Sequence, residues 1–442
     1  MTAFRLLPLS VALAAAAAAL PARAQNLVTL YEAARAFDAG YQSAQYQFEA
    51  TAAKSEQARA GTLYKIDLAA AASISTVDNT LATSKQGGYD VQSATLSASQ
   101  PLYRPGNQIA FEQSKRQIDV EEQKLLSAEQ ELIMKLSTAY FEVLASQDSL
   151  AYLLAQKAAV TEQLASAKRN FEVGTATITD TREAEARFDL VVAQEIAGRN
   201  DLQVKKLALD QLVGKPNSAP LPVKLPLQLP PVMPSDVAAW VQKSEEMHPA
   251  VRQSRLAFEV AQMEAKKAQA ATLPTLDLTG NLNMANNNNT TTSAVTSFRT
   301  TTATVGLSFN MPLFSGYAIE NRIKEALALE EKARTDLEAV KRSVAQASRT
   351  AFFGLLSGQG QVKALQAAEA SSQSALDANK LGYQVGVRIN IDVLNSQSQL
   401  FDTKAKLAKA RYDVLLGGLK LHQASGILKA EDLKQVNTLL AN

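Results

Sequence analysis

The sequence contains no cysteine and only two histidines, His248 and His422, among 442 residues. An exported protein of this composition has no disulfide, no thiolate metal ligand, no cysteine nucleophile and no lipid-modified amino-terminal cysteine. No H-E-x-x-H, P-loop, G-x-S-x-G or G-x-G-x-x-G motif occurs. We therefore expect no enzymatic activity, no catalytic residues, no bound metal and no cofactor.

Beyond its first 24 residues the chain also lacks a long apolar run and a net charge. Residues 1–24 are predicted to be a signal peptide, with Arg5 in a positive segment, an apolar stretch at 6–20 and an A-x-A cleavage site at 22–24. The apolar stretch is shorter than the roughly 20 residues of a spanning helix. Cleavage removes two arginines and no acid, which leaves 43 basic and 43 acidic residues. This balance argues against a nucleic-acid partner.

One short stretch occurs twice, and the rest of the chain can be placed relative to it. Residues 171–180 read FEVGTATITD and residues 383–392 read YQVGVRINID, at an offset of 212. Glycine favours the left-handed backbone just past a helix end, so Gly174 and Gly386 predict two helix-to-helix turns. Either Asp or Thr is a good N-cap for the helix that follows, and Asp180, with Glu183 three residues later, matches a capping box.

Further matches at nearly the same offset indicate that the whole chain is a tandem duplication. They are residues 47–50 with 257–260 and 63–68 with 273–278 at 210, and residues 138–141 with 350–353 and Gly214 with Gly426 at 212.

In each repeat the hydrophobic period changes from helical to two after the first helical part. Residues 303–311 show this most clearly, with apolar residues at alternate positions and Thr, Gly, Ser or Asn between them. Such alternation predicts strands with one apolar and one polar face. A soluble β-sandwich is one interpretation. We favour a membrane wall, because the strands reach the roughly ten residues that a tilted transmembrane strand needs. Four strands are too few to close a barrel, so copies of the chain would have to share one.

Segment lengths give a second indication. The helical stretch after Gly106 runs for about 67 residues, near 100 Å at 1.5 Å per residue, and its counterpart begins at Gly316. The other helical segments are about half as long, so two stacked short helices would match one long helix. An ordinary antiparallel coiled coil is the alternative. Seven of the fourteen prolines lie in residues 215–235, which predicts an extended connector.

These features divide the sequence into nine segments. They are a signal peptide at 1–24, a helix at 25–62, a transmembrane β-hairpin at 63–105, a long helix, turn and half-length helix at 106–214, a proline-rich linker at 215–235, a helix at 236–272, a second transmembrane hairpin at 273–315, a second long helix, turn and half-length helix at 316–426, and a C-terminal tail with little signal at 427–442.

The signal, the two hairpins, the paired long and half-length helices and the two Val-Gly turns resemble the TolC family of outer-membrane exit ducts. The resemblance covers nearly the whole mature chain, including residues 273–278 and 382–386. It implies a homotrimer in the Gram-negative outer membrane, whose hairpins build one 12-stranded β-barrel in lipid and whose helices form a periplasmic α-barrel. It also implies work with a periplasmic adaptor and an inner-membrane transporter, to export drugs or unfolded polypeptides in an efflux pump or type I secretion system.

The resemblance also implies roles for residues at the two turns. The gate latch would comprise Thr179, Asp180, Tyr383 and Arg388, partly across subunits. Arg388 and Asp180 could form a charge-assisted pair. The periplasmic aperture would carry Asp392, but the second acidic position of the family is Asn395 here. Three copies would then offer three aspartates where a typical member offers six, so a weaker cation preference is expected. Simple helix capping is the alternative role for Asp180 and Asp392.

A protein of another class remains possible on the sequence alone. It is a periplasmic adaptor or scaffold built from helical hairpins. An adaptor has no need of lipid-facing strands, so the alternation at 303–311 favours the channel.

Overall fold

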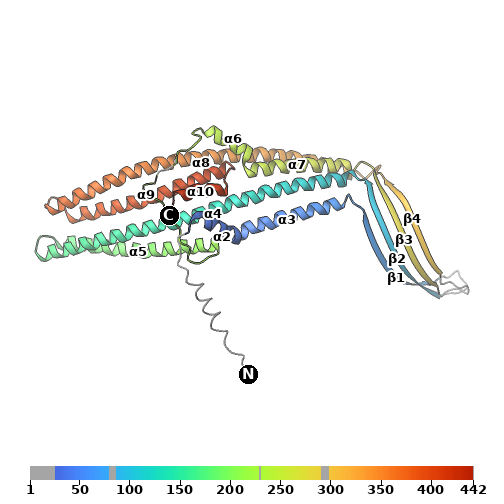
Figure 1. Ribbon diagram of the computed structural model, residues 1–442, viewed down its shortest axis with the longest axis horizontal. Coiled ribbons are helices and arrows are strands. Elements are labelled where there is room, and N and C mark those ends of the chain that lie inside the picture. Colours follow the sequence, from blue (N-terminus) through green and yellow to red (C-terminus); the bar gives the residue numbers. More distant parts are fainter. Residues whose placement is uncertain (1–24, 79–85, 228–229, 290–297, 442) are drawn as a thin grey trace, which may run out of the picture. The chain divides into compact units, whose positions relative to one another are not determined.

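The computed structural model describes residues 25–78, 86–227, 230–289 and 298–441 (Figure 1). The predicted signal peptide lies outside the described residues. The chain divides into two compact units. Unit 1 comprises the chain up to Gln45, Leu125–Val251 and the chain from Lys341, and unit 2 comprises Tyr46–Lys124 and Arg252–Val340. The longest helices, α4 (Pro105–Glu172) and α8 (Ala318–Gln384), contribute residues to both.

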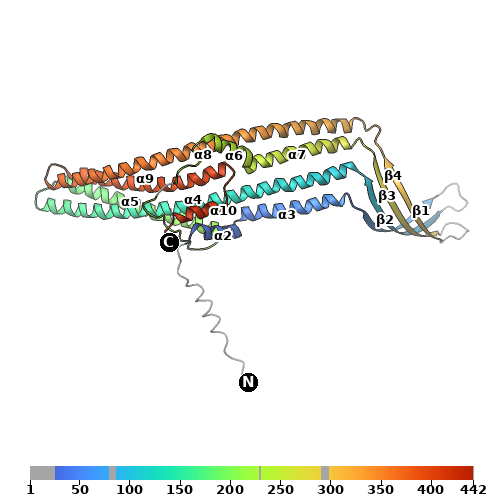
Figure 2. The same cartoon turned by 45° about the horizontal axis from the view of Figure 1, so that its top comes forward.

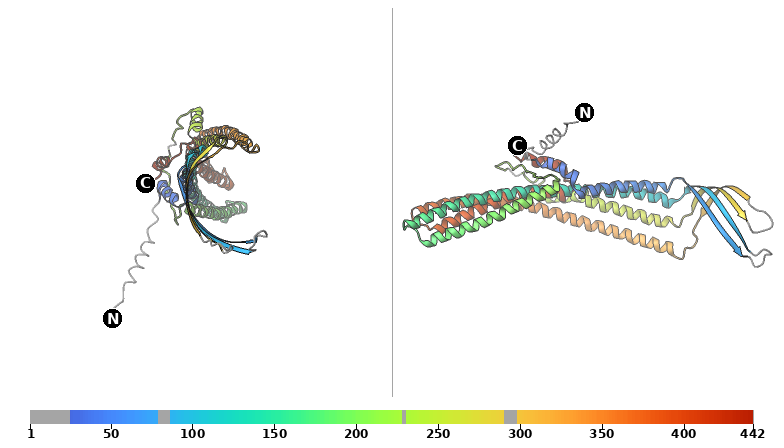
Figure 3. Two further views of the ribbon diagram at one scale, coloured as in Figure 1. Left: turned by 90° about the vertical axis from the view of Figure 1, so that its right-hand side faces the viewer. Right: turned by 90° about the horizontal axis from the view of Figure 1, so that it is seen from below.

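Unit 2 contains a single antiparallel sheet of four strands, in the order β1-β2-β3-β4. The strands are β1 (Lys65–Asp78), β2 (Gln86–Tyr103), β3 (Thr275–Asn289) and β4 (Phe298–Asn310). The two hairpins of the duplicated sequence thus meet at the β2–β3 seam, and the strands curve together (Figure 3). In the described part of this single chain, the outer edges of β1 and β4 have no pairing strand.

The sheet has one apolar and one polar face, as the alternation of the sequence predicted. Leu68, Leu96, Leu282 and Ala303 are cross-strand partners in one row, and their neighbours Asp67, Ser97, Asn281 and Thr304 form a row on the other face. On β2 the apolar side is the more exposed, because Ala94, Leu96 and Ala98 are exposed while Ser93, Thr95 and Ser97 are half-buried. A sheet that shows an exposed apolar face to its surroundings needs a cover, which can be lipid.

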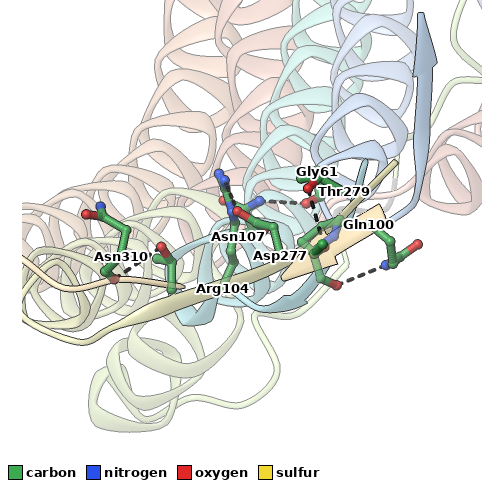
Figure 4. A network of polar contacts seen from close by, with 10 residues as sticks. Gly61, Gln100, Arg104, Asn107, Asp277, Thr279 and Asn310 are labelled. Carbon is green, nitrogen blue, oxygen red and sulfur yellow. Dashed lines mark hydrogen bonds and ion pairs between the residues drawn. The ribbon is translucent and has the colours of Figure 1, made fainter. Parts of the chain in front are cut away.

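Polar contacts fasten the seam where the two hairpins meet the helices (Figure 4). The Arg104 guanidinium donates two hydrogen bonds to the Asp277 carboxylate, from Nε to Oδ1 at 2.7 Å and from Nη2 to Oδ2 at 2.5 Å. Asn107 donates to the carbonyl of Gly61 at 2.6 Å. A bidentate charged pair has a fixed geometry, so it sets how the end of β2 meets the start of β3.

The helices of unit 2 pack through small residues. They are parts of α3 (Ala39–Ala60), α4, α7 (Pro249–Ala270) and α8. Ala265 and Ala268 of α7 pack against Ala326 of α8, so these two backbones lie close together.

Unit 1 holds the main hydrophobic core. Its further helices are α2 (Leu27–Phe37), α5 (Ile178–Val213), α6 (Val237–Met247), α9 (Asn390–Ala424) and α10 (Ala430–Thr438). In this unit α5 lies along α4 and α9 along α8 (Figures 1 and 2). Tyr140 is fully buried at the centre and donates a hydrogen bond to the carbonyl of Leu221 in the connector at 2.9 Å. Lys157 of α4 and Arg199 of α5 both donate to the Glu195 carboxylate, and these hydrogen bonds lower its pKa.

The two first helical segments of the repeats are each broken, although the sequence pattern predicted continuous helices. The breaks fall at Asp38 and His248, which are equivalent at the offset of 210. Each of these side chains accepts a hydrogen bond from the first turn of the next helix, Asp38 from the Tyr41 amide at 2.8 Å and His248 from the Ala250 amide at 3.1 Å. Local capping by a polar side chain competes with helix continuation, and this explains both breaks.

The landmark glycines Gly214 and Gly426 lie against these breaks. A Cβ at Gly214 would come within 2.4 Å of the Phe37 ring, and one at Gly426 within 2.3 Å of the His248 backbone. Both glycines also have positive φ, +71° and +73°. Only glycine satisfies the close approach and the left-handed backbone together, so each repeat keeps it.

Residues 427–442, a tail with little signal in the sequence, contain the short helix α10. Helix α10 buries Leu433 and Val436 in the core of unit 1. Its Asn437 accepts a hydrogen bond from the Leu27 amide at 3.0 Å, which satisfies a donor at the start of α2. The amphipathic pattern of nine residues is too short to stand out in a sequence.

Candidate functional site

The two Val-Gly turns lie at one end of unit 1, where α4 passes into α5 and α8 into α9. The two turns have the same pattern of backbone hydrogen bonds. The amide of Gly174 donates to the carbonyl of Phe171 at 3.0 Å, and that of Gly386 to the carbonyl of Tyr383 at 3.1 Å. The next two amides of each turn both donate to one carbonyl, that of Asn170 or Gly382. Gly174 and Gly386 have φ of +78° and +79°, the left-handed conformation that ends a helix.

The two turns differ in how they begin the next helix. In the first, Thr177 is the N-cap and forms a capping box with Asp180, whose Oδ2 accepts from the Thr177 amide at 2.9 Å and hydroxyl at 2.6 Å. Of the two residue types expected at the N-cap, Asp and Thr, the threonine takes that position, and Asp180 is the third helical residue of the capping box, with Thr177 rather than Glu183 as its partner. In the second turn, Ile389 stands at the equivalent position and makes no side-chain cap. Among the described residues, the Asp392 carboxylate therefore makes no capping hydrogen bond at the start of α9.

The structure places the predicted latch residues near one another without joining Asp180 to Arg388. In the described part of this single chain, Arg388 of the turn lies 3.6 Å from the carboxylate of Asp392, four residues later in the first turn of α9. Tyr383 instead accepts a hydrogen bond from the Asn170 amide at 3.2 Å, which links α8 to α4. Thr179 is exposed.

Asn390 is the residue that ties the two turns together, and the sequence interpretation missed it. Its side chain is fully buried. It donates to the carbonyl of Asp180 at 3.1 Å and accepts from the side-chain amide of Gln163. It therefore connects the start of α9 to the first turn and to α4. The first repeat has Ile178 at the equivalent position, so the departure from repeat symmetry was the available signal.

A second pair joins the half-length helices. Arg187 of α5 donates from Nη2 to the Oδ1 of Asn395 of α9 at 2.8 Å. Asn395 and Asp392 are three residues apart, so they share one side of α9. The polar groups of the site are thus amides, hydroxyls, carboxylates and guanidinium groups that hold helix ends together. Among the described residues, no cluster of three or more His, Asp or Glu side chains could hold a metal ion.

Within the described residues, no helix combines the length and apolar character required to cross a bilayer.

The family model for outer membrane efflux proteins matches the chain twice, over residues 30–215 and 240–426. The chain belongs to this family. The two matches correspond to the two repeats that the sequence predicted, and the family is one of channel proteins rather than enzymes. This decides against the alternative of a periplasmic adaptor or scaffold.

Similar proteins agree with the family assignment. Outer membrane protein TolC of Vibrio cholerae is 30% identical over 98% of this chain and 98% of its own length. The alkaline protease secretion protein AprF of Pseudomonas aeruginosa is 30% identical over 79% of this chain and 72% of its own length. The crystal structure of the outer membrane protein VceC of Vibrio cholerae has a TM-score of 0.78 at 18% identity, covering 90% of this chain and 96% of that one, which shows a common fold. The predicted resemblance to the TolC family is therefore confirmed. The protein is thus an outer-membrane channel of the class that serves efflux and type I secretion.

Proposed function

We propose that three copies of this chain form the outer-membrane exit duct of a tripartite efflux pump or type I secretion system. The single observation that carries the proposal is the four-stranded sheet with an apolar face and two open edges, held on long helices. Open edges are not tolerated in lipid, and the smallest outer-membrane barrels have about eight strands. Pairing of β4 with β1 of the next copy removes every edge, and three copies give the 12 strands that the resemblance implies.

The partners in this proposal are a periplasmic adaptor and an inner-membrane transporter. Exposed apolar side chains at the two turns support a docking role, and among them Val173 is 72% and Val387 75% exposed. The transported substrate is a drug or an unfolded polypeptide. The relative AprF, named for secretion of alkaline protease, supports the second class.

The gate of the duct is proposed at the turns. Asp392 and Asn395 would line the periplasmic aperture, and Thr179, Asp180, Tyr383 and Arg388 would latch it between copies. Within one chain Arg388 contacts Asp392 at 3.6 Å, in a pair whose side chains are 58% and 34% exposed. Exposed pairs of this kind contribute about 1 kcal/mol or less. Arg388 can therefore exchange its own Asp392 for Asp180 of another copy at little cost, which suits a latch that a partner releases.

The test is the electrical conductance of the purified protein in planar bilayers. The wild type should conduct poorly, because the closed tip dominates the resistance. Arg388→Ser combined with Tyr383→Phe removes the guanidinium and the hydroxyl and should raise the conductance several-fold with trimer stability unchanged. Arg334→Ser, in an exposed pair with Glu331 on α8, is the matched control and should leave conductance unchanged. A double variant that conducts like the wild type would mean that these residues only shape the turns.

A further inference from the structure

Arg187 places a positive charge beside Asn395, the residue that stands at the second acidic position of the family. Its guanidinium donates to the Oδ1 of Asn395 at 2.8 Å and is half-buried. No carboxylate of the described residues lies within 4.0 Å of it. By contrast, Arg182, one turn and a residue earlier on the same helix, is paired with Glu185 at 2.8 Å. Arg187 is thus an uncompensated cation beside α9.

The charges along this side of α9 can be summed from the contacts. Asp392 contributes one negative charge, and Arg388 lies 3.6 Å from it. Asn395 contributes none, and Arg187 is bound to it. These four side chains sum to one net positive charge in the single chain, and to zero once Asp180, which the proposed latch places beside Arg388, is included. Three copies would then carry no net negative charge at this level, where the Asp392 ring alone would carry three.

We propose that Arg187 is a specificity-determining residue of the channel, which makes its narrow end non-selective or weakly anion-selective. This inference rests on the proposed function, because it needs Asp392 and Asn395 to line the aperture. The amide at Asn395 is essential to the effect. It accepts one hydrogen bond and leaves the guanidinium charged, whereas a carboxylate there would form a bidentate pair and cancel the charge. Anionic solutes and acidic polypeptide segments would then pass without the repulsion of a double acidic ring.

The size of the effect follows from Coulomb's law. A unit charge about 7 Å from a permeating ion, in a water-filled opening, changes its local concentration on the order of threefold. Salt screens the interaction over about 10 Å at 0.1 M, so the effect should weaken at high ionic strength.

The experiment is the reversal potential of the whole purified protein in planar bilayers under a KCl gradient. Arg187→Gln keeps a hydrogen-bond donor and removes the charge, and it should raise the potassium-to-chloride permeability ratio on the order of sevenfold, because the charge acts on the cation and the anion in opposite directions. Asn395→Asp should raise it similarly by neutralising Arg187. The two changes together should give the largest cation preference. Arg187→Lys keeps the charge and should retain the wild-type ratio, which separates charge from a structural role. Arg182→Gln is the control on the same helix.

The outcomes distinguish the inference from the function on which it rests. A conducting Arg187→Gln channel with the wild-type reversal potential would overturn the role of Arg187 and leave the duct intact. Equal changes for Arg187→Gln and Arg187→Lys would show that the hydrogen-bond geometry acts, and would also overturn it. A wild-type protein that forms no channel would overturn the proposed function itself.

Discussion

Leu96→Arg is expected to prevent assembly of the protein in the outer membrane, whereas Thr95→Arg, one residue away, is tolerated. Leu96 lies between Leu68 and Leu282 in the apolar row of the sheet, and Thr95 lies on the polar face, where its hydroxyl accepts a hydrogen bond from Asn283 at 2.7 Å. An arginine on the lipid face of an outer-membrane strand costs about 2–4 kcal/mol near the bilayer midplane. In a trimer this free-energy cost applies to each of the three chains, whereas an arginine on the lumen side remains in water.

The measurement is the amount of each variant recovered in outer membranes and its migration as a heat-sensitive oligomer on gels. Both substitutions add the same side chain to the same strand, so a general folding defect would affect them alike. Equal assembly of the two variants would contradict a lipid-facing role for this row. Loss of Thr95→Arg alone would mean that the faces are reversed.

Asn390→Ile should open the tip more strongly than loss of the charged residues. The substitution puts into the second repeat the residue that the first repeat has at Ile178, so helix α9 can still begin there. It leaves the Asp180 carbonyl and the Gln163 amide without their buried partner. Each unsatisfied group of this kind costs about 1–3 kcal/mol. The two turns would then separate, so that water can hydrogen-bond to these two groups. Conductance in planar bilayers should therefore rise several-fold.

Gln399→Ala provides the control for this prediction. Gln399 is exposed on the same helix, and its side chain donates a hydrogen bond to the Thr403 hydroxyl of that helix at 3.3 Å. Its removal should change neither conductance nor thermal stability. If Asn390→Ile lowers thermal stability while conductance stays at the wild-type level, Asn390 supports the fold and does not hold the tip closed.

Much of the fold could be predicted because the sequence is a tandem duplication and each pattern occurs twice. The Val-Gly turns, the strand alternation and the long helices recur at offsets of 210 to 212, so each weak signal was supported by its copy. The breaks at Asp38 and His248 also recur, but a polar residue inside a helical pattern does not by itself show that it caps the next helix. Helix α10 occurs once and could not be supported in this way.

The site was predicted less completely, for a physical reason. The sequence analysis selected charged and aromatic residues, Asp180, Tyr383 and Arg388, because their chemistry suggests partners. Within one chain the joining groups are instead the amides Asn390 and Asn170. An amide both donates and accepts, so its partner cannot be inferred from its type. Only the packing of α4 against α9 shows that Gln163 and Asn390 meet.

The central claim is that three copies close one barrel, and the absence of cysteine permits a direct test. The duplication predicts which residues meet between copies. Within one chain Leu96 of β2 faces Leu282 of β3. The equivalent positions are Leu307 of β4 and Ala72 of β1, from the offsets of 211 between Pro101 and Pro312 and of 210 between Leu68 and Leu278. In a single chain these two positions lie on the outer strands of the sheet, and the row through Ala72 meets β4 at Arg299, eight residues from Leu307. At about 3.3 Å per residue the two positions are offset by about 26 Å along the strands, too far for a disulfide.

The measurement is oxidative crosslinking of Leu307→Cys combined with Ala72→Cys in isolated outer membranes, followed by gels without reductant. The account predicts covalent dimers and trimers that reductant removes. The matched pair of Leu307→Cys with Ala71→Cys, whose side chains point to opposite faces of the sheet, should give few. A protein that stays monomeric with the first pair, or crosslinks equally with both, would contradict closure of the barrel by β1 and β4 of neighbouring copies.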